Sequence, residues 1–150
     1  MQLEKITNNN LNAVLALQLD EAQRDFVSEN VVSMAQAAVN PDYQPRVAMV
    51  DGEVIGFVMY SEWKNAPWAT SDKLGEYYIF RVMTDKSYQG KGYGRLMMEA
   101  LIKEIEELKP KAIHIGYCDE NKVAQQFYQK LGFKEYGRFD WGDIAASIVY

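Results

Sequence analysis

A glycine-rich segment that joins an apolar strand to an amphipathic helix is the strongest constraint on the fold. Residues Tyr77 to Met83 predict a strand, and Gln89-Gly90-Lys91-Gly92-Tyr93-Gly94 leads into a helix with apolar residues at helical spacing as far as Leu108. Backbone N–H groups converge in such a turn, and the helix N-terminus adds partial positive charge. The segment therefore suits an anionic ligand, although three alternating glycines could also serve only to shape a tight connection.

Two common phosphate-binding motifs do not account for this segment. A P-loop ends in Gly-Lys followed by Ser or Thr, and the segment lacks that ending. The dinucleotide-binding fingerprint has a further glycine three residues after its second, and here Arg95 stands three residues after Gly92. The sequence therefore excludes both motifs at this position.

Composition narrows the class of protein. The chain has 150 residues, 48% of them hydrophobic, and a formal net charge of -5, which fits a single domain over residues 1–150. Because phosphate contacts need clustered Lys and Arg, this acidic balance disfavours nucleic-acid binding and suits a cationic ligand better. The single cysteine, Cys118, and the single histidine, His114, exclude an internal disulfide and a Cys/His zinc cluster, so we expect no metal.

The apolar runs bear on location. The longest of them, such as Ile144 to Val149, are too short to span a bilayer, and the polar start of the chain has no signal-peptide core. We therefore expect a cytoplasmic protein without a membrane partner.

The hydrophobic patterns predict strands and helices in an order typical of an α/β or α+β fold. A hairpin around Asp51-Gly52 gives the clearest strand signal. Strands are expected at residues 2–7, 46–50, 54–60, 77–83, 112–118, 133–139 and 143–149, and helices around residues 11–19, 27–38, 93–108 and 121–131. The strands complete one sheet with helices on both of its faces.

Two motifs link the chain to a known family. Gln89 to Gly94 fits the pattern Arg/Gln-x-x-Gly-x-Gly/Ala, and Asn121 to Phe133 fits Asn-x-x-Ala-x-x-Phe/Leu-Tyr-x-x-x-Gly-Phe. With these motifs and its order of elements, the chain resembles the GCN5-related N-acetyltransferases over nearly its whole length. That resemblance implies a mixed sheet of about seven strands, splayed between strands 4 and 5. Within the family it is most similar to bacterial spermine/spermidine acetyltransferases.

The resemblance implies acetyl-CoA as cosubstrate. Backbone N–H groups of the glycine loop would hold its pyrophosphate, the preceding strand would bond the pantetheine arm, and an amide at the start of the last helix would contact pantetheine from the other side. The residues so implied are Val82, Met83, Thr84, Gln89, Gly90, Lys91, Gly92, Tyr93, Gly94, Arg95 and Asn121.

Tyr128 is the candidate general acid. A phenol with a pKa of about 10 stays protonated at neutral pH, yet it can give its proton to a departing thiolate whose thiol has a pKa of about 8.5. Its position in the second motif implies this role. The alternative is a core tyrosine, because Ala124, Phe127 and Leu131 share its helix face.

The acceptor amine must lose a proton before it can attack the thioester. An alkylammonium has a pKa of about 10.4, so a base or desolvation must offset its protonation. Related polyamine enzymes use a glutamate on the strand before the glycine loop, and the matching position here is Tyr78, which we expect to contact the substrate. Glu76 lies two residues before Tyr78 and therefore on the same face of the strand, so we name it as the candidate base. The alternative is that Glu76 is an ordinary solvated glutamate.

A polyamine would need carboxylates spaced along its length. Glu21, Asp25 and Glu29 recur every four residues, which on one helix would form a single acidic stripe. Trp63, together with Trp68, could pack on the methylene chain or hold an ammonium by cation–π attraction. The alternatives are a solvated helix face and tryptophans that anchor the core. Asp20, Glu62 and Asp143 are further carboxylates that could contribute.

Two classes of function remain open. The first is an N-acetyltransferase acting by direct attack in a ternary complex on a polyamine, or alternatively on a protein N-terminus, an aminoglycoside or an amino acid. The second is a module of the same fold that binds CoA or a polyamine without turnover. His114 and Cys118 lie too far apart on one strand for a dyad. By analogy with relatives, the strand Ile144 to Tyr150 could form a homodimer interface.

Overall fold

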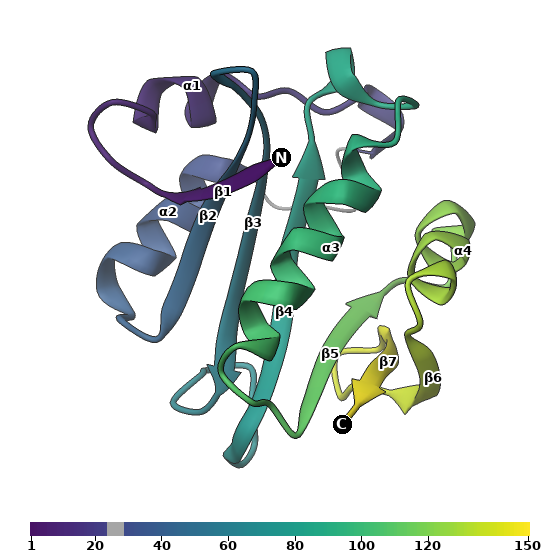
Figure 1. The fold of residues 1–150 in the computed structure, drawn as a ribbon. Helices are drawn as coiled ribbons and strands as arrows, with labels where there is room; N and C mark the ends of the chain where they lie inside the picture. Colours follow the sequence, from purple (N-terminus) through teal and green to yellow (C-terminus); the bar gives the residue numbers. More distant parts are fainter. Residues whose placement is uncertain (24–28) are drawn as a thin grey trace.

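Strands and helices follow one another in the order that the hydrophobic patterns predict. The structure, a computed structural model, describes residues 1–23 and 29–150 (Figure 1). Its elements are β1 (Gln2–Lys5), α1 (Leu11–Ala16), the 3-10 helix η1 (Glu21–Gln23), α2 (Asn30–Val39), β2 (Tyr43–Val50), β3 (Glu53–Trp63), β4 (Lys73–Thr84), the 3-10 helix η2 (Lys86–Tyr88), α3 (Tyr93–Glu106), β5 (Ala112–Tyr117), α4 (Lys122–Lys130), β6 (Lys134–Arg138) and β7 (Ile144–Val149).

The strands form one mixed sheet in the order β1-β2-β3-β4-β5-β7-β6. Neighbouring strands run antiparallel except for β4 and β5, which are parallel. This confirms the expected mixed sheet. The parallel pair is joined through α3, a crossover that a parallel connection requires.

Alternating side chains of β3 divide the apolar core between the two faces of this sheet. Val58 and Tyr60 pack with the buried residues of α3. Phe57 and Met59 pack on the other face with Val14 of α1 and with apolar side chains of α2. Figure 1 shows α3 and α2 on these opposite faces. Because burying each such side chain stabilises the fold by about 1.5–3 kcal/mol, the two clusters hold the centre of the sheet rigidly in place.

Strands β4 and β5 diverge part of the way along their length. Their pairing runs only from Glu76 opposite Ala112 to Ile79 opposite Ile115. Beyond Ile79, the remaining part of β4 pairs with β3 alone. The predicted splay between the fourth and fifth strands is therefore present, and it leaves backbone groups on the β5 side of β4 open to a ligand.

A β-bulge lies where the two strands begin to separate. Opposite β3, the register steps from Arg81 paired with Met59 to Ile79 paired with Tyr60, so Phe80 is the extra residue. A bulge changes the direction in which side chains leave the strand. Phe80 packs in the cluster on the α1 and α2 face, and Arg81 donates a hydrogen bond to α2, so two consecutive residues point to the same side of the sheet.

Candidate active site

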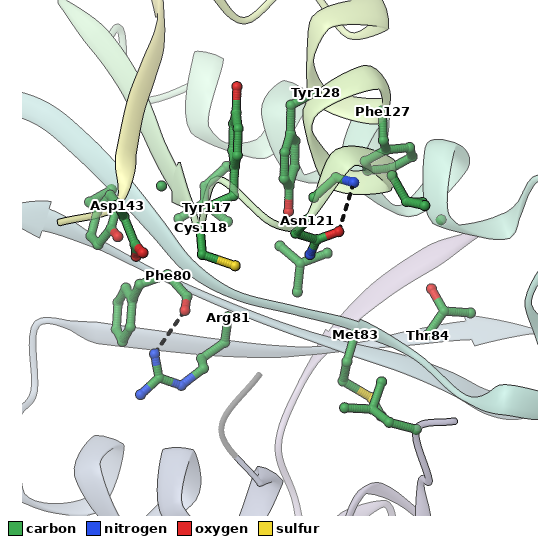
Figure 2. Close-up of a pocket in the computed structure, with 18 of the residues that line it drawn as sticks. Phe80, Arg81, Met83, Thr84, Tyr117, Cys118, Asn121, Phe127, Tyr128 and Asp143 are labelled. Atoms are coloured by element: carbon green, nitrogen blue, oxygen red, sulfur yellow. Dashed lines mark hydrogen bonds between the residues drawn. The ribbon is translucent and has the colours of Figure 1, made fainter. Parts of the chain in front are cut away.

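A cavity of about 1180 Å³ occupies the space between the diverging strands. Its wall is formed by the end of β4, the glycine loop, the start of α3, the end of β5 and α4, together with Trp68 and Trp141 from two loops. Figure 2 shows side chains from β4 on one side of this cavity and Asn121 and Tyr128 on the other.

The glycine loop presents free backbone N–H groups at one end of the cavity. Gly92, the N-cap of α3, has φ of +84°, and a Cβ at this position would meet no atom within 4 Å. The first intrahelical bond runs from the N–H of Leu96 to the carbonyl of Gly92 at 3.3 Å. The N–H groups of Tyr93, Gly94 and Arg95 consequently have no helical acceptor, which fits a phosphate group.

Hydrogen bonds within the loop hold this N-terminus in position. Asp85 caps η2 by accepting from the backbone N–H of Ser87 at 2.9 Å, and it also accepts from the N–H of Gln18 at 2.8 Å. These bonds lower the pKa of its carboxyl against the opposing effect of burial. The Nε2 of Gln89 donates to the carbonyl of Thr84 at 3.0 Å. The loop is therefore fixed to both β4 and the segment after α1.

Asn121 begins α4 opposite the end of β4. Its Oδ1 accepts from the backbone N–H of Ala124 at 3.1 Å, which caps the helix (Figure 2). The Nδ2 of Asn121 has no hydrogen-bond acceptor among residues 1–23 and 29–150, and Asn121 lines the cavity. Its amide can therefore donate to a ligand carbonyl in the gap.

Tyr128 lies about two helical turns further along α4, and its hydroxyl points into the cavity (Figure 2). Its ring stacks on Tyr117 with centroids 5.8 Å apart and lies edge-on to Phe133 at 5.8 Å. Burial raises the pKa of the Tyr128 phenol to about 12, so the group is protonated at neutral pH. The hydroxyl makes no hydrogen bond with another described residue, which leaves its proton available to a ligand.

Most residues predicted to contact the cosubstrate line this cavity. They are Val82, Met83, Thr84, Gln89, Gly90, Gly92, Gly94, Arg95 and Asn121. The side chains of Lys91 and Tyr93 lie outside the lining. Lys91 donates from Nζ to the carbonyl of Ser87 at 3.3 Å, and the ring of Tyr93 packs edge-on against Tyr88 at 5.9 Å.

Glu76 does not face the cavity. It lies where β4 and β5 are still paired, and its Oε1 is 2.8 Å from Nε2 of His114. The Nδ1 of His114 is 2.7 Å from the hydroxyl of Tyr136, and burial lowers the pKa of this histidine. The geometry therefore supports neither role that we considered for Glu76, a base in the cavity or a freely solvated carboxylate.

The predicted acidic stripe does not form on one helix. Glu21 lies in the short helix η1, whereas Glu29 has an extended backbone (φ -61°, ψ 147°) and precedes α2. Both side chains are exposed and outside the cavity lining, and Asp25 lies outside the described residues. Regular spacing predicts a common face only when the helix is continuous, and the extended conformation at Glu29 interrupts it.

The three aromatic residues named for the acceptor occupy different places. Tyr78 and Trp68 line the cavity, with ring centroids 4.9 Å apart. Trp63 is buried behind them at the end of β3, where its ring lies 5.1 Å from that of Trp68 and 5.0 Å from His114. Trp63 therefore supports the cavity wall from the core, the alternative that we left open for it.

The sequence did not predict that two residues, Trp141 and Asp143, line the cavity. Trp141 and Asp143 come from the turn between β6 and β7, and Asp143 is the only Asp or Glu among the described residues of the lining. The sequence indicated Asp143 only as a further carboxylate that could contribute to acceptor binding, and it did not single out Trp141. No local pattern marks this turn as part of the site, because the tertiary fold brings it to the cavity.

Arg81 was also not foreseen as a cavity residue. It donates from Nε to Oγ of Ser33 at 3.0 Å, from Nη2 to Oε1 of Gln36 at 3.2 Å and from Nη1 to the carbonyl of Phe80 at 2.8 Å (Figure 2). Burial lowers the pKa of its guanidinium. No carboxylate of the described residues pairs with it, so a positive charge faces the α2 side of the cavity.

Neither a metal-binding cluster nor a membrane-spanning helix occurs in the part of the chain that the structure describes. Residues 1–23 and 29–150 contain no group of three or more His, Cys, Asp or Glu side chains placed to hold a metal ion. Within the same residues, no helix combines the length and apolar character needed to cross a membrane.

Known proteins resemble this chain over most of its length. Residues 11–133 match the Acetyltransferase (GNAT) family. A probable spermine N(1)-acetyltransferase from Bacillus subtilis subsp. natto is 30% identical over 142 residues, which cover 94% of this chain and 92% of that protein. The spermine/spermidine N(1)-acetyltransferase of Bacillus subtilis strain 168 has the same identity and coverage.

Solved structures share the fold at lower sequence identity. The PaiA N-acetyltransferase of Thermoplasma acidophilum, in complex with coenzyme A, matches with a TM-score of 0.72 and 16% identity over 99% of this chain and 98% of that chain. The aminoglycoside acetyltransferase AAC(6')-Ib, in complex with coenzyme A and kanamycin, has a TM-score of 0.78 and 19% identity over 98% and 93% of the two chains. The two motifs, the splayed sheet and these likenesses identify the chain as an acetyltransferase of the GNAT family.

Proposed function

We propose that this acetyltransferase transfers the acetyl group of acetyl-CoA to a primary amine of a polyamine such as spermine or spermidine. The observation that carries the proposal is one continuous cavity with free helix N–H groups at one end and aromatic rings with Asp143 at the other. The first end suits an anion and the second a cation. Relatives named as spermine acetyltransferases, at 30% identity over 94% of the chain, support the acceptor.

The cavity fits coenzyme A in charge and shape. The free N–H groups of Tyr93, Gly94 and Arg95 would hold the diphosphate, and Gly92 leaves space for its close approach. The unpaired edge of β4 from Val82 to Thr84 and the Nδ2 of Asn121 would bond the amide groups of the pantetheine arm. When bound, acetyl-CoA supplies the acetyl group as a thioester, and the CoA thiol is the leaving group.

Tyr128 supplies the proton that the leaving thiolate needs. Its hydroxyl points into the cavity and has no competing acceptor among the described residues. Burial keeps the phenol protonated, with a pKa of about 12, and the surrounding rings of Tyr117 and Phe133 hold its orientation. Desolvation also makes the departing thiolate more basic, so it takes up this proton more readily at short range.

The acceptor nitrogen would enter from the α1 and α2 side of the sheet, opposite the side from which Tyr128 approaches. Tyr78 and Phe80 face the α1 and α2 side, with stacked rings 5.9 Å apart, whereas Tyr128 comes from α4. The amine and the thioester would therefore meet in the gap between β4 and β5, beyond Ile79, where the two strands no longer pair. Direct attack through a ternary complex follows from this two-sided access. No step is assigned to Glu76, because its carboxylate contacts His114 outside the cavity lining.

One observation favours a second acceptor class. The guanidinium of Arg81 lines the same cavity without a carboxylate partner among the described residues. An amino acid or a peptide N-terminus carries oxygen acceptors that such a cation would bind. Acetylation of an α-amine is therefore the alternative to polyamine acetylation.

An assay of free-thiol release with a panel of amines separates these possibilities. Acetyl-CoA would be supplied at saturation, and the panel would contain spermine, spermidine, a monoamine of matched length, several amino acids and a short peptide. We expect saturable thiol release with spermine and spermidine. Release with the amino acids or the peptide alone would establish the second acceptor class, and no release with any amine, despite CoA binding, would indicate a binding module.

A further inference from the structure

Aromatic side chains gather at the end of the cavity away from the glycine loop. Four of them line the cavity, and we call them the aromatic cage: Trp68, Tyr78, Phe80 and Trp141. Trp68 lies 4.9 Å from Tyr78 and 6.2 Å from Trp141 between ring centroids, and Tyr78 lies 5.9 Å from Phe80. The cage thus combines a loop before β4, β4 itself and the turn between β6 and β7.

The position of the cage depends on a missing side chain. Gly116 of β5 lies beneath it, and a Cβ there would come within 3.0 Å of Cε2 of Phe139 and 3.1 Å of the hydroxyl of Tyr78. Phe139 in turn stacks on Trp141 with centroids 4.5 Å apart and an interplanar angle of 14°. The rings therefore pack directly on the backbone of β5, and the cage is a built wall of the cavity.

Asp143 places one negative charge beside this wall. Its Oδ2 accepts from Nε1 of Trp141 at 3.1 Å, which ties the carboxylate to the cage. Its charge is the second cause, after burial, that raises the pKa of the Tyr78 phenol. No Lys or Arg of the described residues forms an ion pair with Asp143. Figure 2 shows Asp143 and Phe80 toward one end of the cavity and Thr84 toward the other.

Arg81 limits where a cation can lie. Its guanidinium carbon is 5.3 Å from the centroid of Phe80, on the side of α2, where Ser33 and Gln36 hold it. Repulsion between like charges therefore keeps a substrate cation away from the α2 side. The side of Trp141 and Asp143 remains for it.

We propose that the aromatic cage and Asp143 bind a second ammonium group of the acceptor, one that is not acetylated. This inference rests on the proposed acetylation of a polyamine and assigns its specificity. Aromatic faces and an unpaired carboxylate both attract a charged alkylammonium. A carboxylate in contact with the reacting nitrogen would favour its protonated form and oppose attack. Asp143 therefore selects amines with a second positive charge.

Steady-state kinetics on Asp143→Asn tests this assignment. Asn has nearly the same shape and keeps an oxygen that can accept from Trp141, so only the charge is lost. The acceptors are spermidine, 1,4-diaminobutane and n-butylamine, and the matched control is Asp140→Asn, an exposed carboxylate outside the cavity lining. We expect the KM of the two polyvalent amines to rise about 10-fold, with those of n-butylamine and acetyl-CoA unchanged. Asp140→Asn should match the wild type.

Calorimetric titration of spermidine into the CoA-saturated protein separates this proposal from the proposed function. Weaker binding of spermidine to Asp143→Asn than to the wild type supports the cage even if no polyamine is acetylated. Polyamine acetylation with equal KM values in Asp143→Asn and the wild type overturns the cage and leaves the proposed function intact. An equal rise for n-butylamine and spermidine also overturns it, because a general distortion of the cavity does not depend on the second charge.

Discussion

The two ends of the cavity would recognise their proposed ligands by different means. At the glycine loop, recognition depends on the backbone: Gly92 adopts a positive φ, and the N–H groups that follow it are free because a helix begins there. At the aromatic cage, recognition depends on side chains from three separate segments, and Trp141 and Asp143 join them only in the folded protein. Backbone recognition is local in the sequence, whereas side-chain recognition is a tertiary property.

This difference explains how one fold can keep its cosubstrate and change its acceptor. Local hydrogen bonds hold the glycine loop and the segment before it to the end of β4, so we expect substitutions elsewhere to leave them in place. The cage includes a turn between β6 and β7, and β6 is an exposed edge strand. Such a turn can vary in sequence without disturbing the core.

Replacement of Tyr128 by Phe should have the largest effect, because it removes the proposed general acid. We expect kcat to fall about 100-fold with little change in the affinity for CoA. Thiol-release kinetics measure kcat, and calorimetric titration with CoA measures the affinity. Tyr150→Phe is the control, since its hydroxyl bonds Glu106 outside the cavity. A kcat within twofold of the wild type would remove Tyr128 as the acid.

The pH profile gives an independent view of the same group. Because burial raises the pKa of Tyr128 to about 12, the protonated acid persists through the alkaline range in which the amine becomes neutral. The rate should therefore rise with pH and show no fall from loss of this proton below about pH 10. An alkaline fall near pH 9 that is absent in Tyr128→Phe would mean that Tyr128 loses its proton there, which would contradict the raised pKa.

Gly92→Ala should weaken the glycine-loop end alone. A residue with a Cβ at φ of +84° is strained by about 1–2 kcal/mol, so the loop should shift and the Kd for CoA should rise about 10-fold. The KM of the acceptor should change little. Gly132→Ala is the control, because Gly132 has φ of +100° and equally open surroundings after α4. If both variants bind CoA equally well, the loop conformation is not what holds the diphosphate.

Gly116→Ala should give the reverse pattern with a smaller magnitude. The added methyl group lies close to Phe139 and to the hydroxyl of Tyr78, so these rings must move by a few tenths of an ångström. We expect the acceptor KM to rise about threefold while the Kd for CoA stays the same. A loss of CoA affinity instead would mean that the two ends are not independent.

The smallest expected effect is a pH dependence of stability from His114, which lies where β4 and β5 are still paired. Burial lowers the pKa of His114, the only histidine of the chain, so the folded state binds its proton less readily than the unfolded state. The stability from this group is therefore full above the unfolded pKa of about 6.5 and declines as the pH falls below it. Urea unfolding from pH 7.5 to 5.5 should show this decline in the wild type and a weaker one in His114→Gln. Equal slopes would assign the decline to other groups.

The sequence predicts elements that depend on local patterns. The seven strands, the glycine loop, the position of Asn121 at the start of the last helix and the place of Tyr128 all follow from periodicity or from motifs within one segment. It could not predict which loop covers the acceptor end, because the approach of Trp141 to Trp68 depends on how β7 pairs with β5 and β6. The acidic stripe failed for a related reason. Spacing alone does not reveal that Glu29 is extended.

Amide hydrogen exchange with and without CoA tests the central claim, that the gap between β4 and β5 holds the coenzyme, most directly. We expect CoA to slow exchange at the N–H groups of Tyr93, Gly94 and Arg95 and along β4 from Val82 to Thr84, while the paired region near Glu76 stays unchanged. Bound CoA that leaves exchange in these two segments unaltered, or that protects residues away from the gap, would contradict the account.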